Sequence, residues 1–353
     1  MWEVLLPACL LTDPAACDRA RGPGGADSAA CREAADALAR DPAPVFGAGS
    51  ASGGGWRAQD WPCVPEGTTP AFPVTEIAPG VWVHKGAHAE PDRANRGDIA
   101  NLGFVIGEEA VAVIDAGSTP AIARDLLAAI RARTALPVRW LILTHMHPDH
   151  ALGAAVFQDQ GATVIGHGRL GAGLAARAES YLAAMRLALG ADMDGARIVT
   201  PDEGVDGVRE IDLGGRYLAL RSHPTAHTDN DLTVLDVQTG VRFLGDLLFM
   251  GHTPALDGAL RGWIAEIEAL AAEPATLIVP GHGPVAAPWP AAAEDQRRYL
   301  ATLAAETRAA IRAGRPMLGA VAEIAESERP RWLLFDAFNQ RNATAAYHEL
   351  EWE

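Results

Sequence analysis

The sequence predicts an α/β (α+β) protein in which two mixed sheets are covered by helices, behind a small cysteine-containing extension. Residues 1–74 indicate the extension, because they hold all four cysteines and a stretch dense in Gly and Pro. From about residue 75, short β-branched runs are separated by turn residues, as in hairpin-connected strands. Later runs alternate with stretches of helical spacing, and no repeat of solenoid length occurs. We therefore expect a cysteine-rich module with a Gly/Pro-rich connector over residues 1–74, and a second domain over residues 75–353 that includes C-terminal helices.

The extension carries Cys9, Cys17, Cys31 and Cys63, and no cysteine follows them. An even number of cysteines in a short segment is typical of a module held by two disulfides, for which three pairings exist. Ordinary thiols or a structural zinc site are alternatives, although the close cysteine pairs typical of zinc ligands are missing. Disulfides would require an oxidising compartment, such as a bacterial periplasm. No signal peptide is visible, so we expect a mature form with an added Met1.

The elements of residues 75–353 follow from hydrophobic period and turn residues. The first strands are short and hairpin-like, and helices then separate the strands. Two strands, within 231–238 and 241–249, are joined by a Gln-Thr-Gly turn typical of a hairpin. The expected strands lie within 81–85, 102–107, 110–117, 138–145, 157–168, 216–224, 231–238, 241–249 and 275–283, and the expected helices within 121–134, 148–159, 178–190, 260–273 and 291–315.

The charge of the chain limits its partners. The formal net charge is −16, the pI is near 5.1, and Lys85 is the only lysine. Nucleic acids and anionic membranes are bound by clustered cations, so we expect neither of them and expect a small-molecule substrate instead. No apolar run approaches the roughly 20 residues that a membrane-spanning helix needs. The oligomeric state is left open.

The stretch THMHPDH, residues 144–150, concentrates metal-ligand side chains at a strand-to-helix turn. Pro148 suits the first position of a helix, so His145 and His147 lie on the extended side of the turn and can point the same way. Asp149 and His150, at the helix start, can face a neighbouring point. One short loop could therefore offer ligands to two metal ions. Imidazole and carboxylate ligands suit zinc, while iron and manganese stay open.

Three further candidate ligands follow at strand ends. His227 lies just before a strand, Asp246 ends the run VRFLGD, and His282 lies in the turn VPGHGP. This series resembles that of the metallo-β-lactamase superfamily. The resemblance implies an αββα sandwich with two metals at one edge, the first bound by His145, His147 and His227, the second by Asp149, His150 and His282, and both by a bridging Asp246. Many β-lactamases use a cysteine near that position, so the site is more similar to those of ester and thioester hydrolases.

A closer resemblance rests on RNATAAYHELEWE, GDLLFMGHTPALDGALRGW, RANRGDIANLGFVIG and the cysteine-bearing leader. Together these are similar to the quinoprotein relay system zinc metallohydrolases, which are SoxH-like proteins. That family implies a link to a periplasmic quinoprotein dehydrogenase system. In the second segment, His252 and Asp257 follow Asp246 closely, so we expect them to line the pocket and bind substrate.

The expected function is that of a dinuclear zinc hydrolase. Two zinc ions would lower the pKa of a bridging water, and the resulting hydroxide would attack a small ester, thioester, lactone or lactam, with Asp149 and Asp246 in catalytic positions. One alternative is an oxidoreductase of the persulfide dioxygenase type, which holds a single iron. The other is a non-catalytic accessory protein of a quinoprotein dehydrogenase. Fold-level analogy does not establish a substrate, so the substrate stays open.

Overall fold

The computed structural model describes residues 2–10, 13–25, 29–30, 33–34, 37, 63–65 and 72–353. The chain divides into two compact units, one of residues 1–71 with 93–95 and the other of residues 72–92 with 96–353. Among the described residues, no helix has both the length and the apolar character that crossing a membrane requires.

The N-terminal unit contains a three-stranded antiparallel sheet of order β2-β1-β3. The register of the first two strands sets Cys9 opposite Cys17. Cys31 lies outside the described residues, as do the side chains of the other three cysteines, so the disulfides stay a prediction. The strands are β1 (Trp2–Leu10), β2 (Asp13–Gly25) and β3 (Cys63–Pro65).

The first sheet of the second unit has seven strands in the order β10-β9-β8-β7-β6-β5-β4. Strands β4 to β7 are antiparallel neighbours, as the hairpin-like sequence predicts, and β7 to β10 are parallel. Parallel neighbours need crossover connections, and helices supply most of them. The strands are β4 (Thr75–Ala78), β5 (Val81–His84), β6 (Leu102–Ile106), β7 (Val111–Ile114), β8 (Val138–Ile142), β9 (Thr163–His167) and β10 (Glu203–Val205).

The second sheet has six strands in the order β11-β12-β13-β14-β15-β16. Strands β13 and β14 form the predicted hairpin, while β14 and β15 are parallel and are connected through a helix. The strands are β11 (Val208–Asp212), β12 (Tyr217–Ser222), β13 (Leu232–Asp236), β14 (Val241–Phe249), β15 (Leu277–His282) and β16 (Ala287–Pro288).

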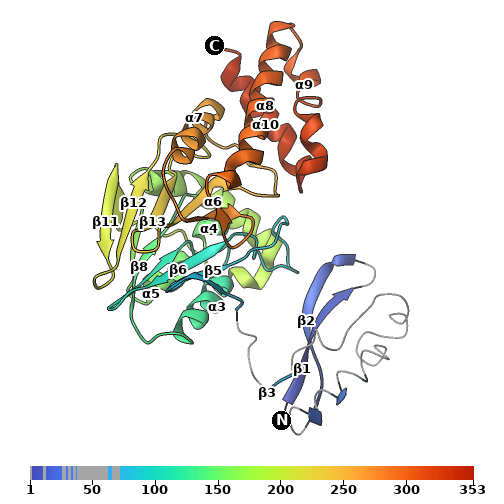
Figure 1. The fold of residues 1–353 in the computed structure, drawn as a ribbon. Coiled ribbons are helices and arrows are strands. Elements are labelled where there is room, and N and C mark those ends of the chain that lie inside the picture. The colour runs from blue at the N-terminus through green and yellow to red at the C-terminus, as the bar shows by residue number, and fades with distance from the viewer. Residues whose placement is uncertain are drawn as a thin grey trace. The chain divides into compact units, whose positions relative to one another are not determined.

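Helices cover the outer faces of both sheets (Figure 1). Buried side chains of α3, α5 and α6 pack on the first sheet, and those of α7, α8 and α10 pack on the second. A third cluster joins the inner faces of the two sheets, for example Val105 with Leu220 and Val234. These layers are αββα and confirm the predicted fold class. The helices are α3 (Pro120–Arg131), α4 (Pro148–Ala151), α5 (Ala154–Asp159), α6 (Leu170–Leu189), α7 (Leu260–Ala271), α8 (Glu294–Arg312), α9 (Met317–Ala320) and α10 (Phe335–Leu350), with 3-10 turns η2 (Gly190–Met193), η3 (Ala291–Ala293) and η4 (Glu326–Arg331).

Several features differ from the sequence-based expectation. The helix expected over 148–159 is two short helices, α4 and α5, interrupted at Leu152 and Gly153. Gly153 lies so close to the carbonyl of Ala116 that a Cβ would be 2.1 Å from its oxygen, so close packing on the neighbouring loop explains the break. Strands β1 to β4, β10, β11 and β16 were not predicted, and α6 begins at Leu170 rather than near residue 178. Helices were expected at the C-terminus, but α9 and α10 were not located, because their sequences are short or lack a clear period.

Candidate metal centre

The strand-to-helix turn after β8 is built as the sequence predicts. His147 is the N-cap of α4 with extended backbone, and Pro148 occupies its first turn. His145 therefore lies on the extended side of the turn and His150 on the helical side. The other candidate ligands come from later elements: His227 between β12 and β13, Asp246 within β14, and His282 at the end of β15.

The structure brings all seven predicted ligands together in two groups. Within each group, one nitrogen or oxygen atom per residue lies within 4.8 Å of the others. All seven belong to the same compact unit, and five of them are fully buried. The first group is His145, His147, His227 and Asp246, and the second is Asp149, His150 and His282.

Each histidine of the two groups is held by a partner that faces away from them. One ring nitrogen donates to a protein oxygen, which fixes the tautomer and leaves the other nitrogen as a lone-pair acceptor. The Thr144 hydroxyl donates to Asp115, so it accepts from His145. The five bonds are His145 Nδ1 to Thr144 Oγ1 (3.0 Å), His147 Nε2 to Asp257 Oδ2 (3.1 Å), His150 Nδ1 to Asp115 Oδ2 (2.8 Å), His227 Nδ1 to the Ala255 carbonyl (2.6 Å) and His282 Nδ1 to the Ile99 carbonyl (2.9 Å).

The inward nitrogens meet one another rather than hydrogen-bond donors. His147 Nδ1 and His227 Nε2 are 3.0 Å apart although both are acceptors in these tautomers. The Nε2 atoms of His145 and His150 are buried and have no hydrogen-bond partner within the described part of the chain. Acceptors that converge in this way repel each other unless they share a cation. The donor set of imidazoles and carboxylates therefore fits a metal ion such as zinc.

Asp246, a member of the first group, also lies close to the histidines of the second group. Its Oδ2 is 3.4 Å from His227 Nε2 and 3.5 Å from His282 Nε2, and its Oδ1 is 3.2 Å from His150 Nε2. It therefore contacts both sets of histidines. Gly281 permits this approach, because a Cβ at that position would lie 1.9 Å from Asp246 Oδ1.

Burial and charge set the protonation states that metal binding requires. Burial lowers the pKa of His227 to about 3 and holds the pKa of His145 well below its ordinary value. Burial also opposes ionisation of Asp246, but His150 and His282 outweigh it and hold the pKa of that carboxyl well below its usual range. Near neutral pH His145 and His227 are thus neutral imidazoles and Asp246 is a carboxylate, which are the forms that bind metals. Burial opposes protonation of His150 and His282, but Asp246 outweighs it and raises the pKa of His150 well above its ordinary value and that of His282 to about 9, so these two rings release a proton when a metal ion binds.

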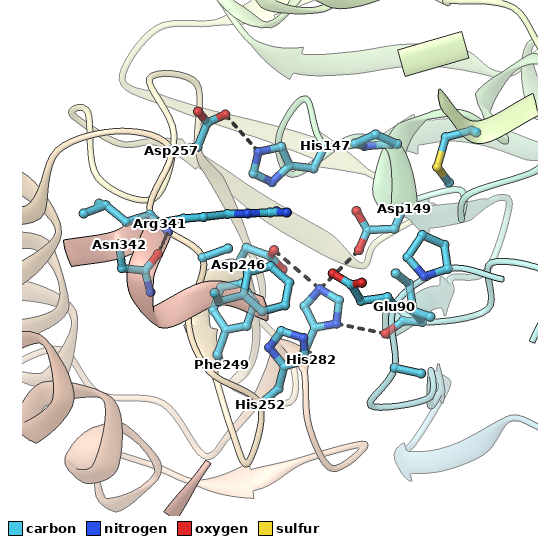
Figure 2. A pocket seen from close by; sticks show the side chains of 18 residues that line it. Glu90, His147, Asp149, Asp246, Phe249, His252, Asp257, His282, Arg341 and Asn342 are labelled. Carbon is cyan, nitrogen blue, oxygen red and sulfur yellow. Dashed lines mark hydrogen bonds and ion pairs between the residues drawn. The ribbon is translucent and has the colours of Figure 1, made fainter. Parts of the chain in front are cut away.

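A pocket of about 360 Å³ opens beside the two groups (Figure 2). His147, Asp149, Asp246 and His282 lie on its inner wall, where a bound molecule could reach them. The pocket is also lined by His252 and Asp257, which the sequence analysis selected as substrate-binding candidates; that role stays a prediction. Apolar lining comes from Ile99, Met185, Phe249, Leu256 and Phe338, and polar lining includes Glu90, Arg341 and Asn342.

The two substrate-binding candidates, Asp257 and His252, also make hydrogen bonds within the protein. Asp257 accepts a hydrogen bond from His147, and it also lies 3.5 Å from the guanidinium of Arg177. His252 donates through Nδ1 to the Thr253 carbonyl at 2.6 Å and stacks on His282 at a centroid distance of 5.1 Å. Its second nitrogen is left as an acceptor, because burial lowers the pKa of His252 to about 4.

Sequence reasoning missed Asp115, which supports the site from one strand away. Its carboxylate accepts from the backbone and hydroxyl of Thr144 and from His150. An available signal is that Asp115 follows the apolar run of β7, the parallel neighbour of β8. Parallel neighbours end at the same edge of a sheet, so an acid there comes close to THMHPDH.

Comparison with known proteins agrees with this site. A family model described as the metallo-β-lactamase superfamily matches residues 95–282, more than half of the chain and the range that contains all seven candidate ligands. A hydroxyacylglutathione hydrolase of Acidiphilium cryptum is 33% identical over 162 residues, which cover 45% of this chain and 56% of the relative. The match thus spans little more than half of the relative's length.

Solved structures share the fold. A metallo-β-lactamase from Pontibacter korlensis has a TM-score of 0.52 and 23% identity, covering 65% of this chain and 98% of its own. The structure of TMB-1 has a TM-score of 0.52 and 17% identity, covering 66% of this chain and 98% of its own. At such identities the likeness shows the fold alone. Together with the match of the family model over residues 95–282, it establishes that this chain belongs to the metallo-β-lactamase superfamily.

Proposed function

We propose that this chain is a dinuclear zinc hydrolase of a small ester, thioester, lactone or lactam. The observation that carries the proposal is the convergence of five imidazoles and the Asp246 carboxylate beside an open pocket. The relative from Acidiphilium cryptum is named a hydroxyacylglutathione hydrolase, which supports hydrolysis of an acyl compound. The complete set of ligand candidates favours two metal ions over the single iron of a persulfide dioxygenase.

We assign the first ion to His145, His147 and His227, the second to Asp149, His150 and His282, and the bridging position to Asp246. Zinc ions bound there would lower the pKa of a coordinated water and polarise a substrate carbonyl. The protein's part is to hold the ligands in place: Asp115, Asp257 and three oxygens of other residues fix the five imidazole rings.

The pocket residues place the reacting groups. Asp149 lines the pocket with its side chain 15% exposed, so its carboxylate can accept a hydrogen bond from the attacking water and orient it. The water oxygen bonds to the carbonyl carbon, the acyl bond to oxygen, sulfur or nitrogen breaks, and a water proton leaves with the alcohol, thiol or amine. Phe249 and Leu256 line the same cavity and limit competing water.

We also propose a periplasmic location with two disulfides, a domain boundary near residue 75, and a link to a quinoprotein system. The location and disulfides are supported by the confinement of all four cysteines to the first 63 residues. The quinoprotein link is supported by the resemblance of three segments, RNATAAYHELEWE, GDLLFMGHTPALDGALRGW and RANRGDIANLGFVIG, and of the cysteine-bearing leader to the relay system zinc metallohydrolases.

The first test is the metal content of protein expressed in an oxidising compartment with zinc, iron and manganese all supplied. We expect about two zinc ions per chain by mass spectrometry, and zinc-dependent turnover in a panel of esters, thioesters, lactones and lactams. One iron per chain with oxygen consumption on a persulfide would replace the proposal by the dioxygenase alternative. A protein without metal and without turnover would support the accessory-protein alternative.

A further inference from the structure

Arg341, on α10, is a cationic side chain of the pocket wall. Figure 2 shows its side chain reaching from α10 across the pocket toward the side of His147 and Asp149. It is exposed, and it forms no ion pair or hydrogen bond with the residues that the structure describes. Arg177 differs, because Asp257 lies 3.5 Å from its guanidinium.

The sequence of α10 explains why Arg341 has no charged partner on its own helix. Charged side chains on a helix pair with residues three or four positions away. Arg329 uses this spacing with Glu326 and also pairs with Asp336, which removes that acid from Arg341. The positions three and four away from Arg341 are Ala337, Phe338, Thr344 and Ala345, none of which is acidic.

The neighbouring residue fixes the place of Arg341. The Asn342 side chain accepts from the backbone nitrogen of Leu256 at 2.9 Å and donates to the Pro254 carbonyl at 2.6 Å. It also donates to the hydroxyl of Tyr299 on α8 at 2.8 Å. This segment of α10 is therefore tied to the loop that follows Asp246, and Arg341 is presented from a rigid frame.

The surroundings suit an anionic ligand group next to an apolar one. Phe338, one turn before Arg341, lines the pocket with Phe249 and Leu256. The acid Glu90 lies on the opposite side, in the loop after β5 (Figure 2). A planar guanidinium matches the two oxygens of a carboxylate better than a point charge does.

We propose that Arg341 binds a carboxylate of the substrate, so that the preferred substrate carries a carboxylate at the end remote from the bond that is hydrolysed. The inference rests on the proposed hydrolase function and narrows its substrate class. It also gives a role to the RNATAAYHELEWE segment, in which Asn342 is the anchor and Arg341 the recognising residue.

The test compares two thioesters that differ in one charge and have no other ester bond: 3-(acetylthio)propionate and its neutral analogue 3-(acetylthio)propanamide. The zinc-loaded protein should hydrolyse the thioester bond of the acid with a kcat/KM at least about tenfold above that of the amide. Arg341→Gln should abolish this ratio, and Arg341→Lys should keep part of it. Arg312→Gln, which removes an exposed arginine at the end of α8, is the charge-matched control and should leave the ratio unchanged.

A binding measurement separates this inference from the proposed function. Saturation-transfer NMR of metal-free protein should detect 3-(methylthio)propionate but not its methyl ester, and the signal should be lost in Arg341→Gln. Equal hydrolysis of the two thioesters, or binding unaffected by Arg341→Gln, would overturn the inference and leave the hydrolase proposal standing. If neither thioester is hydrolysed, the proposed function fails for this class, and the Arg341 dependence of the NMR signal alone decides the inference.

Discussion

The two sides of the pocket differ in whether their polar atoms have hydrogen-bond partners within the protein. On the side of the candidate metal ligands, inward nitrogens such as His147 Nδ1 and His227 Nε2 face each other as acceptors. On the side of α10, the polar atoms are matched: the Asn342 amide makes three hydrogen bonds, and both oxygens of Glu349 accept from the first turn of α7. Arg341 is the exception on that side.

This difference separates residues that we expect to bind a metal ion from residues that stabilise the fold. Buried acceptors without donors cost free energy on the order of 1–3 kcal/mol each, so they persist where a ligand satisfies them. The amide of Asn342 already has hydrogen-bond partners in the protein, so it stabilises the fold without a ligand. Loss of a metal-side residue should therefore change metal binding more than folding, and loss of an α10-side residue should do the reverse.

The largest effect is expected for Asp246→Ala. This removes the carboxylate that approaches both histidine groups, so metal content should fall and hydrolysis should drop by more than the ~100-fold that loss of a supporting partner can cost. The fold should persist, because neither the core on the second sheet nor the cluster between the sheets contains this side chain. Metal analysis and circular dichroism of the same preparation measure both. Wild-type metal content in this variant would contradict the dinuclear assignment.

The next effect compares two acids that each hold one imidazole. Asp115 is buried with three bonds, whereas the Asp257 side chain is 41% exposed and holds His147 at 3.1 Å. Asp115→Asn should weaken zinc affinity by about 10- to 100-fold, and Asp257→Asn by less. Titration with a competing chelator measures both affinities. Equal losses would mean that burial does not set the strength of support.

The grouping of the candidate ligands could be predicted from the sequence because most of them lie next to the end of a short apolar run; His227 instead precedes β13, and Asp246 lies within β14 rather than at its end. Such runs predict strands, and the ends of strands in a layered sheet meet at an edge. Pro148 then fixed the start of α4, which separates His145 from His150. These signals are local, so a single sequence contains them.

The supporting contacts could not be predicted, because they join residues far apart in the chain. Asp115 is 35 positions from His150, and Asn342 is 86 positions from Leu256. No local period reports which strand or loop an asparagine will meet. The contacts of Asn342 depend on the layer in which α10 packs, and tertiary packing determines that layer.

Loss of the α10 anchor should show the reverse behaviour from Asp246→Ala. Asn342→Ala leaves the nitrogen of Leu256 and the carbonyl of Pro254 without their partner, so the free energy of unfolding should fall by about 1–3 kcal/mol. Zinc stoichiometry should stay at the wild-type value, because no ligand is held by Asn342. Urea unfolding and metal analysis check the two parts. Lost metal at unchanged stability would break the distinction between the two sides.

The smallest effect tests a polar pair beneath the ligand loop. Glu266 on α7 accepts from His223 Nδ1 at 2.7 Å, and this bond lowers the pKa of the buried carboxyl below its ordinary value of 4.5 despite the opposing effect of burial. A depressed pKa stabilises the fold fully above that value, and the contribution is lost as the pH falls through the folded pKa. Glu266→Gln should therefore cost about 1 kcal/mol at neutral pH, and the difference from wild type should shrink below a pH of about 4.

Metal-free protein is the right sample for this comparison, since acid also releases metal from histidines. Urea unfolding of the wild type and Glu266→Gln across that pH range gives the difference directly. A satisfied pair should behave like the α10 side even though His223 lies only four residues before His227. A difference that stayed constant down to the acid limit would show that the lost packing of Glu266 matters and its charge does not, and proximity to the ligands would then be a better guide to role than hydrogen-bond satisfaction.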